Sequence, residues 1–463
     1  MGLFSSDRSP GGKLAVAILI GLLLAIPLFS VWLMVYDREQ QSRTASQSIA
    51  EGWGGPQRVA GPLLVIPYRA TVTETVTEAG RPVVRSRQVW QELTLSPDVA
   101  DLETRVVPER RKRSIYEVVV YEAEVAGKAR FAMPADLARF GVAVSDMALD
   151  RAELRFGLSD PRGLYGQPPS VSVGGQKLRL QPGGGTLATN GAGFFAWLDA
   201  GALVGKPIAV DYAFAFRGNG WLSLAPQAGD TRWRVTSPWP HPSFQGGFLP
   251  VERSVGDKGF TATYRVGNLA LGQSLVATGA PQQQERAPMV EPSGYDVAAP
   301  ASGYEARINL VQPVDLYSRV NRATKYGFLF IGFTFLAFLL FDVIGGVRVS
   351  GVEYLLVGAG LVLFFILLLA FAEVIGFAPA YLVASAAIIG LNTAYSAAVL
   401  KSWRRAAYIG ALLVGLYVVL YILLSLEAFS LLIGSLLLLV ALAAVMYLTR
   451  NLNWRGAAAA EGA

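Results

Sequence analysis

The sequence predicts a membrane protein with six transmembrane helices, arranged as one plus five, and a large inserted extracytoplasmic domain of antiparallel strands, similar to a sandwich or roll. Its composition of 52% hydrophobic and 16% charged residues fits neither a soluble enzyme nor a pure helical bundle. The apolar residues concentrate at both ends of the chain, and the charged residues concentrate between them. This split indicates one soluble domain carried on membrane spans.

The predicted segments follow one another along the chain. They are a cytoplasmic N-terminus (1–13), a transmembrane signal anchor (14–36), the extracytoplasmic β-rich domain (37–325), a five-helix transmembrane bundle (326–449) and a cytoplasmic tail (450–463). The anchor is uncharged and exceeds the roughly 20 apolar residues that cross a bilayer. A cleaved signal peptide has a shorter apolar region followed by small residues, which this segment lacks. We therefore expect an uncleaved anchor.

Five further apolar runs form the predicted bundle. They cover 326–347, 354–372, 377–400, 406–426 and 429–448. Their acidic residues lie at the span ends, at Asp342, Glu353, Glu373 and Glu427. Ion pumps and coupled transporters place ionisable residues near mid-bilayer, so this pattern does not select transport. Small residues four positions apart favour close helix packing instead, at Ala380, Ala384, Ala386 and Gly390.

The orientation follows from lysine and arginine in the short flanks of the spans. With a cytoplasmic N-terminus, eight basic residues lie inside: Arg8, Lys13, Arg348, Lys401, Arg404, Arg405, Arg450 and Arg455. The opposite connections near Glu373 and Glu427 carry neither lysine nor arginine. The pattern predicts that both termini are cytoplasmic and that the large domain lies outside the cytoplasm.

Three basic residues disagree with this pattern, because they lie on the predicted outer side just before the second span. Arg319, Arg322 and Lys325 are spaced by three and would share an arc of about 120° on a helix. The simpler interpretation is that they reach the lipid headgroups. The alternative is a specific contact with anionic lipid or with a partner.

Five segments of the middle domain are predicted strands, because they are rich in Val, Tyr, Thr and Phe and are bounded by turn residues. They cover 62–75, 82–95, 114–125, 207–216 and 260–271, and a short helix is expected over 133–140. Strands without a regular alternation with helices favour an antiparallel sandwich or roll. Gly- and Pro-rich connections are expected at 161–191 and 278–304.

The residues that most enzymes need are scarce, so we predict a protein that is not an enzyme and has no cofactor or metal site. The chain has no cysteine and a single histidine, His241, which lies between two prolines on a predicted structural turn. One histidine cannot supply the ligands of a usual catalytic zinc. No G-x-S-x-G nucleophile elbow is present. The glycine run at 183–185 lacks the Lys-Ser/Thr ending of a phosphate loop and is interpreted as a turn.

The basic run at 109–113 is interpreted as a solvated loop or a charged strand edge that discourages edge pairing. Binding of anionic lipid or of glycan phosphate is the alternative. The net charge of +6 is spread over the chain and includes many residues at membrane edges. Nucleic-acid binding would require a concentrated basic face, so we expect none.

Several long strings resemble the CreD family of bacterial inner-membrane proteins, over nearly the whole chain. They include GWGGPQRVAGPLLVIPY, KRSIYEVVVYEAEVAG, SPWPHPSFQGGFLP and PVDLYSRVNRATKYGFLFIGFTFLAFLLFD. The resemblance implies a location in the bacterial inner membrane and an association with cell-envelope integrity and an envelope-response regulon. It supplies no catalytic residue. The matching positions mark family pattern only: Trp53, Gly54, Gly55, Tyr116, Glu117, Trp239, His241 and Pro242.

The leading hypothesis is a non-enzymatic inner-membrane protein that supports envelope integrity. Its expected partners are membrane lipids, other envelope proteins and cell-wall components, contacted through the exported domain. Two alternatives stay open: a transporter or lipid-handling protein that uses the bundle, and a hydrolase of the exported domain that uses two carboxylates.

Overall fold

The computed structural model describes residues 10–78, 81–113, 116–279, 304–310, 316–343, 349–425 and 430–450. The chain forms two compact units. The helical unit combines Met1–Gln41 with Val314–Ala463, and the β unit covers Ser42–Pro313. Helix α1 (Pro10–Trp53) therefore belongs to the helical unit up to Gln41 and to the β unit beyond it.

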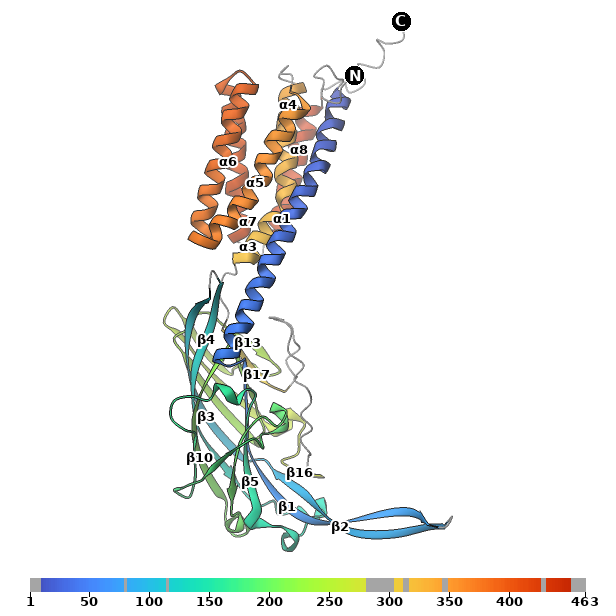
Figure 1. Cartoon of the computed structure of the whole chain (residues 1–463), viewed down its shortest axis with the longest axis vertical. Coiled ribbons are helices and arrows are strands. Elements are labelled where there is room, and N and C mark those ends of the chain that lie inside the picture. Colours follow the sequence, from blue (N-terminus) through green and yellow to red (C-terminus); the bar gives the residue numbers. More distant parts are fainter. Residues whose placement is uncertain are drawn as a thin grey trace. The chain divides into compact units, whose positions relative to one another are not determined.

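The helical unit consists of helices, most of them apolar, that run along one another (Figure 1). Besides α1 they are α3 (Leu316–Lys325), α4 (Gly327–Val343), α5 (Gly351–Ile375), α6 (Phe377–Val399), α7 (Trp403–Ser425) and α8 (Ser430–Thr449). Five described segments are long and apolar enough to cross a membrane: Gly12–Ala45, Leu316–Leu340, Gly351–Ile375, Phe377–Val399 and Trp403–Ser425. Five of the six predicted spans thus coincide with helices that are long and apolar enough to cross a membrane, and the span at α8 stays a prediction.

Helix α3 lies before the point where the second span was expected to begin. Its sequence is amphipathic, and Tyr317, Val320 and Ala323 are buried on one side of it. Because the residues on its other side are polar, α3 does not form a continuous apolar run in the sequence. Helix α5 begins at a capping box, in which the Ser350 amide donates to the Glu353 carboxylate at 2.7 Å. The S-x-x-E pattern explains why Glu353 lies at a span end.

Aromatic side chains from α4, α5, α6 and α7 form the centre of the bundle. Tyr417 lies 4.6 Å from Phe364 and 5.1 Å from Phe330, measured between ring centroids. Tyr381 donates its hydroxyl to the Tyr417 carbonyl at 2.6 Å. The helices thus meet through large side chains as well as through small ones.

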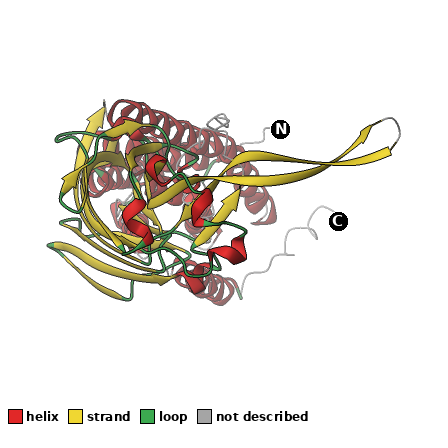
Figure 2. Cartoon of the chain, turned by 90° about the horizontal axis from the view of Figure 1, so that it is seen from below, coloured by secondary structure: helices red, strands yellow, loops and turns green. Residues whose placement is uncertain are grey.

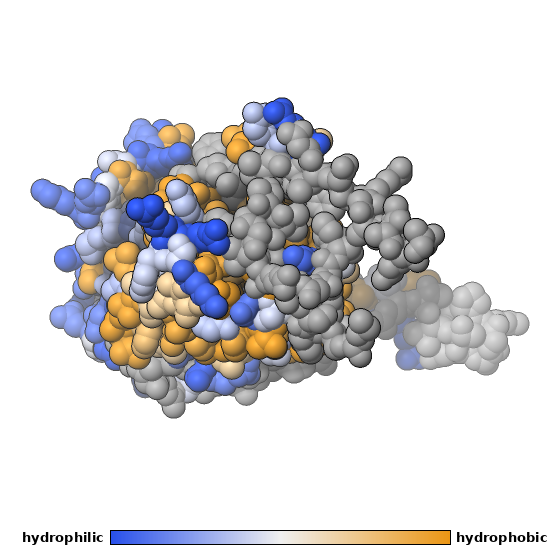
Figure 3. All heavy atoms as spheres, turned by 90° about the horizontal axis from the view of Figure 1, so that it is seen from above, coloured by the Kyte–Doolittle hydropathy of each residue, from blue (hydrophilic) through white to orange (hydrophobic). Residues whose placement is uncertain are grey.

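Two of the four small residues of α6 lie where close helix packing was predicted. Ala380 and Ala384 are fully buried, whereas Ala386 and Gly390 face outward. The two pairs differ because they lie on different sides of the helix. Seen from above, the described face shows broad hydrophobic areas beside groups of hydrophilic side chains (Figure 3).

The β unit contains two mixed sheets. The nine-stranded sheet has the order β13-β17-β11-β1-β5-β9-β8, and in addition β2 pairs with β1 and β16 pairs with β2. Its strands are β1 (Gln57–Glu78), β2 (Arg81–Leu95), β5 (Ala152–Leu158), β8 (Leu180–Pro182), β9 (Gly193–Leu198), β11 (Trp221–Ala225), β13 (Pro242–Gly246), β16 (Val276–Gly279) and β17 (Ala306–Leu310).

The eight-stranded sheet has the order β14-β15-β12-β3-β4-β10-β6-β7. Its strands are β3 (Val99–Arg113), β4 (Tyr116–Phe131), β6 (Ser170–Val173), β7 (Gln176–Lys177), β10 (Ile208–Asn219), β12 (Asp230–Ser237), β14 (Glu252–Gly256) and β15 (Gly259–Gly267). The connections contain α2 (Asn268–Leu271) and short 3-10 helices at Leu137–Phe140, Val144–Asp146, Leu149–Arg151, Pro161–Gly163, Leu187–Thr189 and Gly201–Val204.

The two sheets pack face to face around one hydrophobic core. Phe156 of the first sheet lies 5.2 Å from Tyr212 of the second, and Phe194 lies 5.4 Å from Phe214, between ring centroids. Strand β10 alternates buried and exposed side chains, as expected for a strand with one face on a core. The β-rich prediction is confirmed.

The sequence predicted purely antiparallel sheets, and this prediction is wrong. Strand β1 pairs with β11 in parallel, and β3 pairs with β12 in parallel. In both cases the partners are distant in the sequence, so no local turn signal reveals the pairing. The expected short helix at 133–140 is a 3-10 turn. The expected connection at 161–191 holds three short strands, and most of the one at 278–304 lies outside the described residues.

Strands β1 and β2 continue beyond the sandwich as a two-stranded arm, which we define as 70–78 and 81–89. The arm extends away from the rest of the β unit in two perpendicular views (Figures 1 and 2). Its strands pair with each other from Ala70↔Val89 to Glu78↔Arg81. Among the described residues, neither strand of the arm has a second neighbour, because β5 and β16 pair only with the base of the hairpin.

Candidate functional site

The predicted basic triplet lies on α3, but its members differ in surroundings. Lys325 is exposed, whereas Arg319 and Arg322 are half-buried. The Arg319 guanidinium lies 5.3 Å from the centroid of the Phe377 ring. Its Nε atom is buried and has no hydrogen-bond partner within the described part of the chain. Arg319 therefore packs against the bundle through a cation–π contact, and its Nε–H does not donate to any described residue.

A second group of polar residues lies at the same end of the bundle, where α5 ends and α6 begins. Glu373 accepts a hydrogen bond from the Tyr317 hydroxyl at 3.3 Å, and its carboxylate lies 3.8 Å from Arg38 Nε. The predicted topology assigns Arg38, Tyr317 and Glu373 to one side of the membrane. Their contact joins α1, α3 and α5 at that side.

In the β unit, the family-pattern residue Trp53 lies between two arginines at the end of α1. The Arg111 guanidinium is 3.6 Å and the Arg217 guanidinium 4.1 Å from its ring centroid. Arg217 is also paired with Glu122 at 3.1 Å. The indole N–H donates to the Tyr121 carbonyl at 3.4 Å. Trp53 thus attaches the helix end to strands β3, β4 and β10.

Gly54 and Gly55 follow Trp53 and fit the same junction. Gly54 has a φ of +128°, and a Cβ there would lie 2.7 Å from the Arg217 carbonyl oxygen. The Gly55 amide donates to Asp160 Oδ2 at 3.0 Å, and Asp160 also pairs with Arg162 at 2.8 Å. Burial raises the pKa of Asp160, but the hydrogen bonds and charge of Arg162 and the Gly55 amide outweigh burial and lower it.

This lowered pKa predicts a pH-dependent junction. The folded pKa lies below the unfolded value of about 3.9, so the carboxylate stabilises the fold above that pH, and the stabilisation is lost as the pH falls through the folded pKa. Asp160→Asn should lower the unfolding free energy at pH 7, with a difference that shrinks as the pH falls below about 4. Denaturant unfolding at several pH values measures this. The exposed control Asp211→Asn should show little effect, and a pH-independent difference for Asp160→Asn would refute the assignment.

A buried ion cluster that the sequence analysis missed lies next to this junction. Glu305 is fully buried and accepts hydrogen bonds from Arg58 at 2.8 Å, from Arg307 and from the Ser223 hydroxyl at 3.2 Å. The Arg307 guanidinium also lies 4.4 Å from the Trp221 ring centroid. Glu305 directly precedes β17, and the other residues come from β1, β11 and β17, which are adjacent strands. Strand pairing between distant segments brings them together, so no local signal could have identified them.

The other family-pattern residues are dispersed. Tyr116 and Glu117 begin β4 and pair in register with Arg113 and Lys112. The run at 109–113 is therefore part of β3 and not a loop. It pairs with β4 on one side, and among the described residues its other side has no strand partner, because β12 pairs with β3 only up to Arg105, so the predicted strand edge holds.

In the segment around the single histidine, some side chains are buried in the core and others are exposed. Trp239 is buried, and the Arg110 guanidinium lies 5.6 Å from its ring centroid. His241 is exposed, so Trp239 is the member of this pair that packs into the core. Pro242 is the first residue of the edge strand β13, where a missing amide proton is tolerated.

Two carboxylates of the β unit, Glu92 and Glu153, form ion pairs with the same arginine. Arg155 lies 2.9 Å from Glu92 and 2.8 Å from Glu153. Burial lowers the pKa of Arg155, but the two carboxylates more than offset this and raise it. A glycosidase needs two carboxyl groups that face its substrate, so this group is better explained as an ion pair. Within the described residues no three His, Asp or Glu side chains could hold a metal ion.

Comparison with known proteins identifies the family. The family described as "Inner membrane protein CreD" matches residues 9–455. The protein named "Inner membrane protein CreD" from Escherichia coli (strain K12) is 33% identical over 439 residues, which cover 94% of this chain and 91% of that protein. The match includes both units and the strings that carry the resemblance. The chain therefore belongs to the CreD family of inner membrane proteins.

Proposed function

We propose that this inner-membrane protein supports cell-envelope integrity without catalysing a reaction, through contacts that its β unit makes outside the cytoplasm. The observation that carries the proposal is the β1–β2 arm. Its outer edges pair with no other strand in the part of the chain that is described. An unpaired strand edge is a template for pairing with another chain.

The composition of the arm supports contact with another protein. A lone two-stranded ribbon is marginally stable in water, so an arm of this kind gains stability from a bound partner. Thr71, Thr73 and Val84 are exposed on it. At about 3.3 Å per residue the arm extends for roughly 26 Å, which is long enough for several strand hydrogen bonds.

Contact with anionic lipid is the second part of the proposal. Arg319, Arg322 and Lys325 lie on a short amphipathic helix that leads into an apolar one. Arg319 keeps a buried Nε without a partner among the described residues. A lipid phosphate would supply an acceptor for such a group. Reversal of all three charges should therefore impair function at normal expression and topology.

A transporter or lipid-handling protein is the second candidate, and buried polar groups in the bundle favour it. Thr334 and Asn392 are buried, and Thr334 Oγ1 and Asn392 Nδ2 have no hydrogen-bond partner in the described residues. Polar groups buried in a membrane often line substrate paths. These two residues are uncharged, and the Asn392 side chain lies against Gly360, as in close helix packing.

Shortening the arm tests the leading proposal. Replacement of 72–87 by an Asn-Gly turn removes the exposed ribbon and none of the residues of the sandwich core. We expect unchanged folding of the β unit, measured by hydrogen exchange on the full chain. We also expect loss of envelope protection in cells, measured as survival under detergent stress.

In-cell photocrosslinking identifies what the arm contacts. A photoreactive residue at Thr73 should capture a discrete protein, whereas the same residue at the exposed Lys128 on the other sheet should not. Normal protection with the shortened arm, together with equal capture at both positions, would contradict the proposed function.

A further inference from the structure

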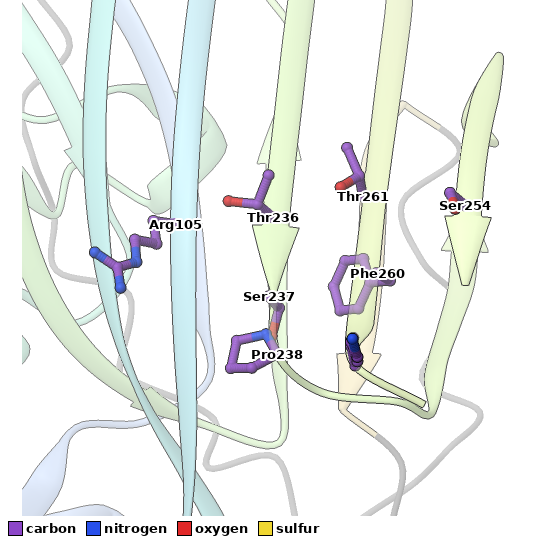
Figure 4. Close-up of a pocket in the computed structure, with 9 residues that line it drawn as sticks. Arg105, Thr236, Ser237, Pro238, Ser254, Phe260 and Thr261 are labelled. Atoms are coloured by element: carbon purple, nitrogen blue, oxygen red, sulfur yellow. The ribbon is translucent and has the colours of Figure 1, made fainter. Parts of the chain in front are cut away.

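A groove of about 410 Å³ lies on the eight-stranded sheet, at the end of β12. Side chains from four adjacent strands reach it: β3, β12, β15 and β14 (Figure 4). It is separate from the arm, from the Trp53 junction and from the ion cluster at Glu305.

Four of its residues form one row across the sheet. Arg105 pairs with Thr236, Thr236 pairs with Thr261, and Thr261 pairs with Ser254. Directly paired residues project from the same face of a sheet, and adjacent strands are about 4.8 Å apart. The row therefore presents an arginine and three hydroxyl groups over roughly 14 Å.

The charged side chains that line the groove are both positive. Arg105 and Lys258 are the charged residues that line it, and no acidic residue does. In the described part of the chain neither of them forms an ion pair, although Glu124 is the register partner of Arg105 on the neighbouring strand β4. By contrast, Arg232 on the same face lies 3.9 Å from Asp101. The two cations of the groove are thus available to an anionic ligand.

The far end of the groove is fixed by backbone geometry. Lys258 lies in the tight turn between β14 and β15, and Gly259 follows it with a φ of +123°. A Cβ at Gly259 would overlap the Ser237 carbonyl oxygen. Glycine therefore allows the turn to approach the end of β12 closely. Ser237 lines the groove at this end, and its hydroxyl accepts from the Trp239 amide at 3.2 Å.

We propose that this groove binds a phosphate group carried on a polyol, such as a phosphorylated sugar or a glycerophosphate. Arginine offers a planar pair of donors that matches phosphate oxygens, and lysine adds a point charge. The hydroxyl row beyond them is longer than one phosphate and can donate to and accept from the hydroxyls of a polyol. The same chemistry occurs on a free metabolite and on a lipid headgroup.

The test uses the full chain in nanodiscs of zwitterionic lipid, with glycerol 3-phosphate as the probe in a calorimetric titration at low salt. We expect saturable binding that Arg105→Gln and Lys258→Gln each weaken by about tenfold or more. The control Arg232→Gln removes a cation from the same face and should change affinity less than about twofold. The double variant Thr236→Val/Thr261→Val should weaken glycerol 3-phosphate more than inorganic phosphate, because only the former has a polyol.

A second titration distinguishes the two sources of the ligand. A short-chain phosphatidylglycerol that binds more tightly than glycerol 3-phosphate, with the same dependence on Arg105, would support the proposal and assign the lipid headgroup. Weaker binding of that lipid would support a soluble ligand. Absence of saturable binding to either probe, or equal losses in Arg105→Gln and Arg232→Gln, would overturn the proposal. Circular dichroism of each variant checks that the sheet is intact, so these outcomes do not depend on the proposed role of the arm.

Discussion

Glu305→Ala should lower the unfolding free energy of the β unit by about 3–5 kcal/mol. The substitution removes the carboxylate shared by Arg58 and Arg307 and leaves both guanidinium groups without their counter-ion. The Arg307 side chain is only 8% exposed, so water cannot replace the lost partner. Because β1 and β17 flank β11, we expect the loss to appear first as faster hydrogen exchange in these three strands.

Two comparisons separate this effect from simple loss of a carboxylate. Asp211→Ala breaks an ion pair with Lys128 whose side chains are 55% and 82% exposed, and it should cost less than about 1 kcal/mol. The triple variant Glu305→Leu/Arg58→Met/Arg307→Met replaces the cluster by apolar groups and should recover much of the stability. Equal costs for Glu305→Ala and Asp211→Ala would show that the buried cluster is not a main support of the sheet.

Gly54→Ala should destabilise the junction at the end of α1 by about 2–4 kcal/mol. The backbone at Gly54 has a left-handed φ of +128°, and the added methyl would meet the Arg217 carbonyl oxygen at 2.7 Å. Arg217 must then move, and its contact with the Trp53 ring weakens. Hydrogen exchange of the segment that contains Trp53 and the start of β1, on the full chain, measures the effect.

Gly52→Ala is the matched control, two residues earlier in the same segment. Gly52 lies inside α1, and a Cβ there meets nothing within 4 Å. Alanine should therefore stabilise the helix by about 0.5–1 kcal/mol. The two substitutions are chemically identical and should have opposite signs. The same sign for both would refute the tight approach at Gly54.

Much of the helical unit could be predicted because a bilayer imposes a simple requirement, a run of about 20 apolar residues. Five such segments are found near the expected positions. Helix α1 extends beyond its apolar run to Trp53, which was not predicted because its last turns are polar and carry no apolar stripe. Helix α3 was missed as a separate helix for a related reason: its apolar face covers only one side.

The β unit was less predictable. Strand composition located five strands, although the last four residues of the segment predicted at 260–271 form α2 instead. The two parallel pairs depend on contacts between distant parts of the chain. The same holds for the sites. Gly54 and Trp239 could be recognised as family pattern, whereas the cluster at Glu305 and the row from Arg105 to Ser254 arise only when strands pair. The basic triplet was found from spacing, but the packing of Arg319 on Phe377 required the bundle.

Thiol accessibility tests the central claim most directly, that the β unit lies outside the cytoplasm. The natural chain has no cysteine, so each introduced thiol reports one position. We expect Thr73→Cys on the arm to react with a membrane-impermeant maleimide in intact spheroplasts. Ser402→Cys, between α6 and α7, should react only after the membrane is permeabilised. Labelling of Ser402→Cys but not Thr73→Cys in intact spheroplasts would contradict the account.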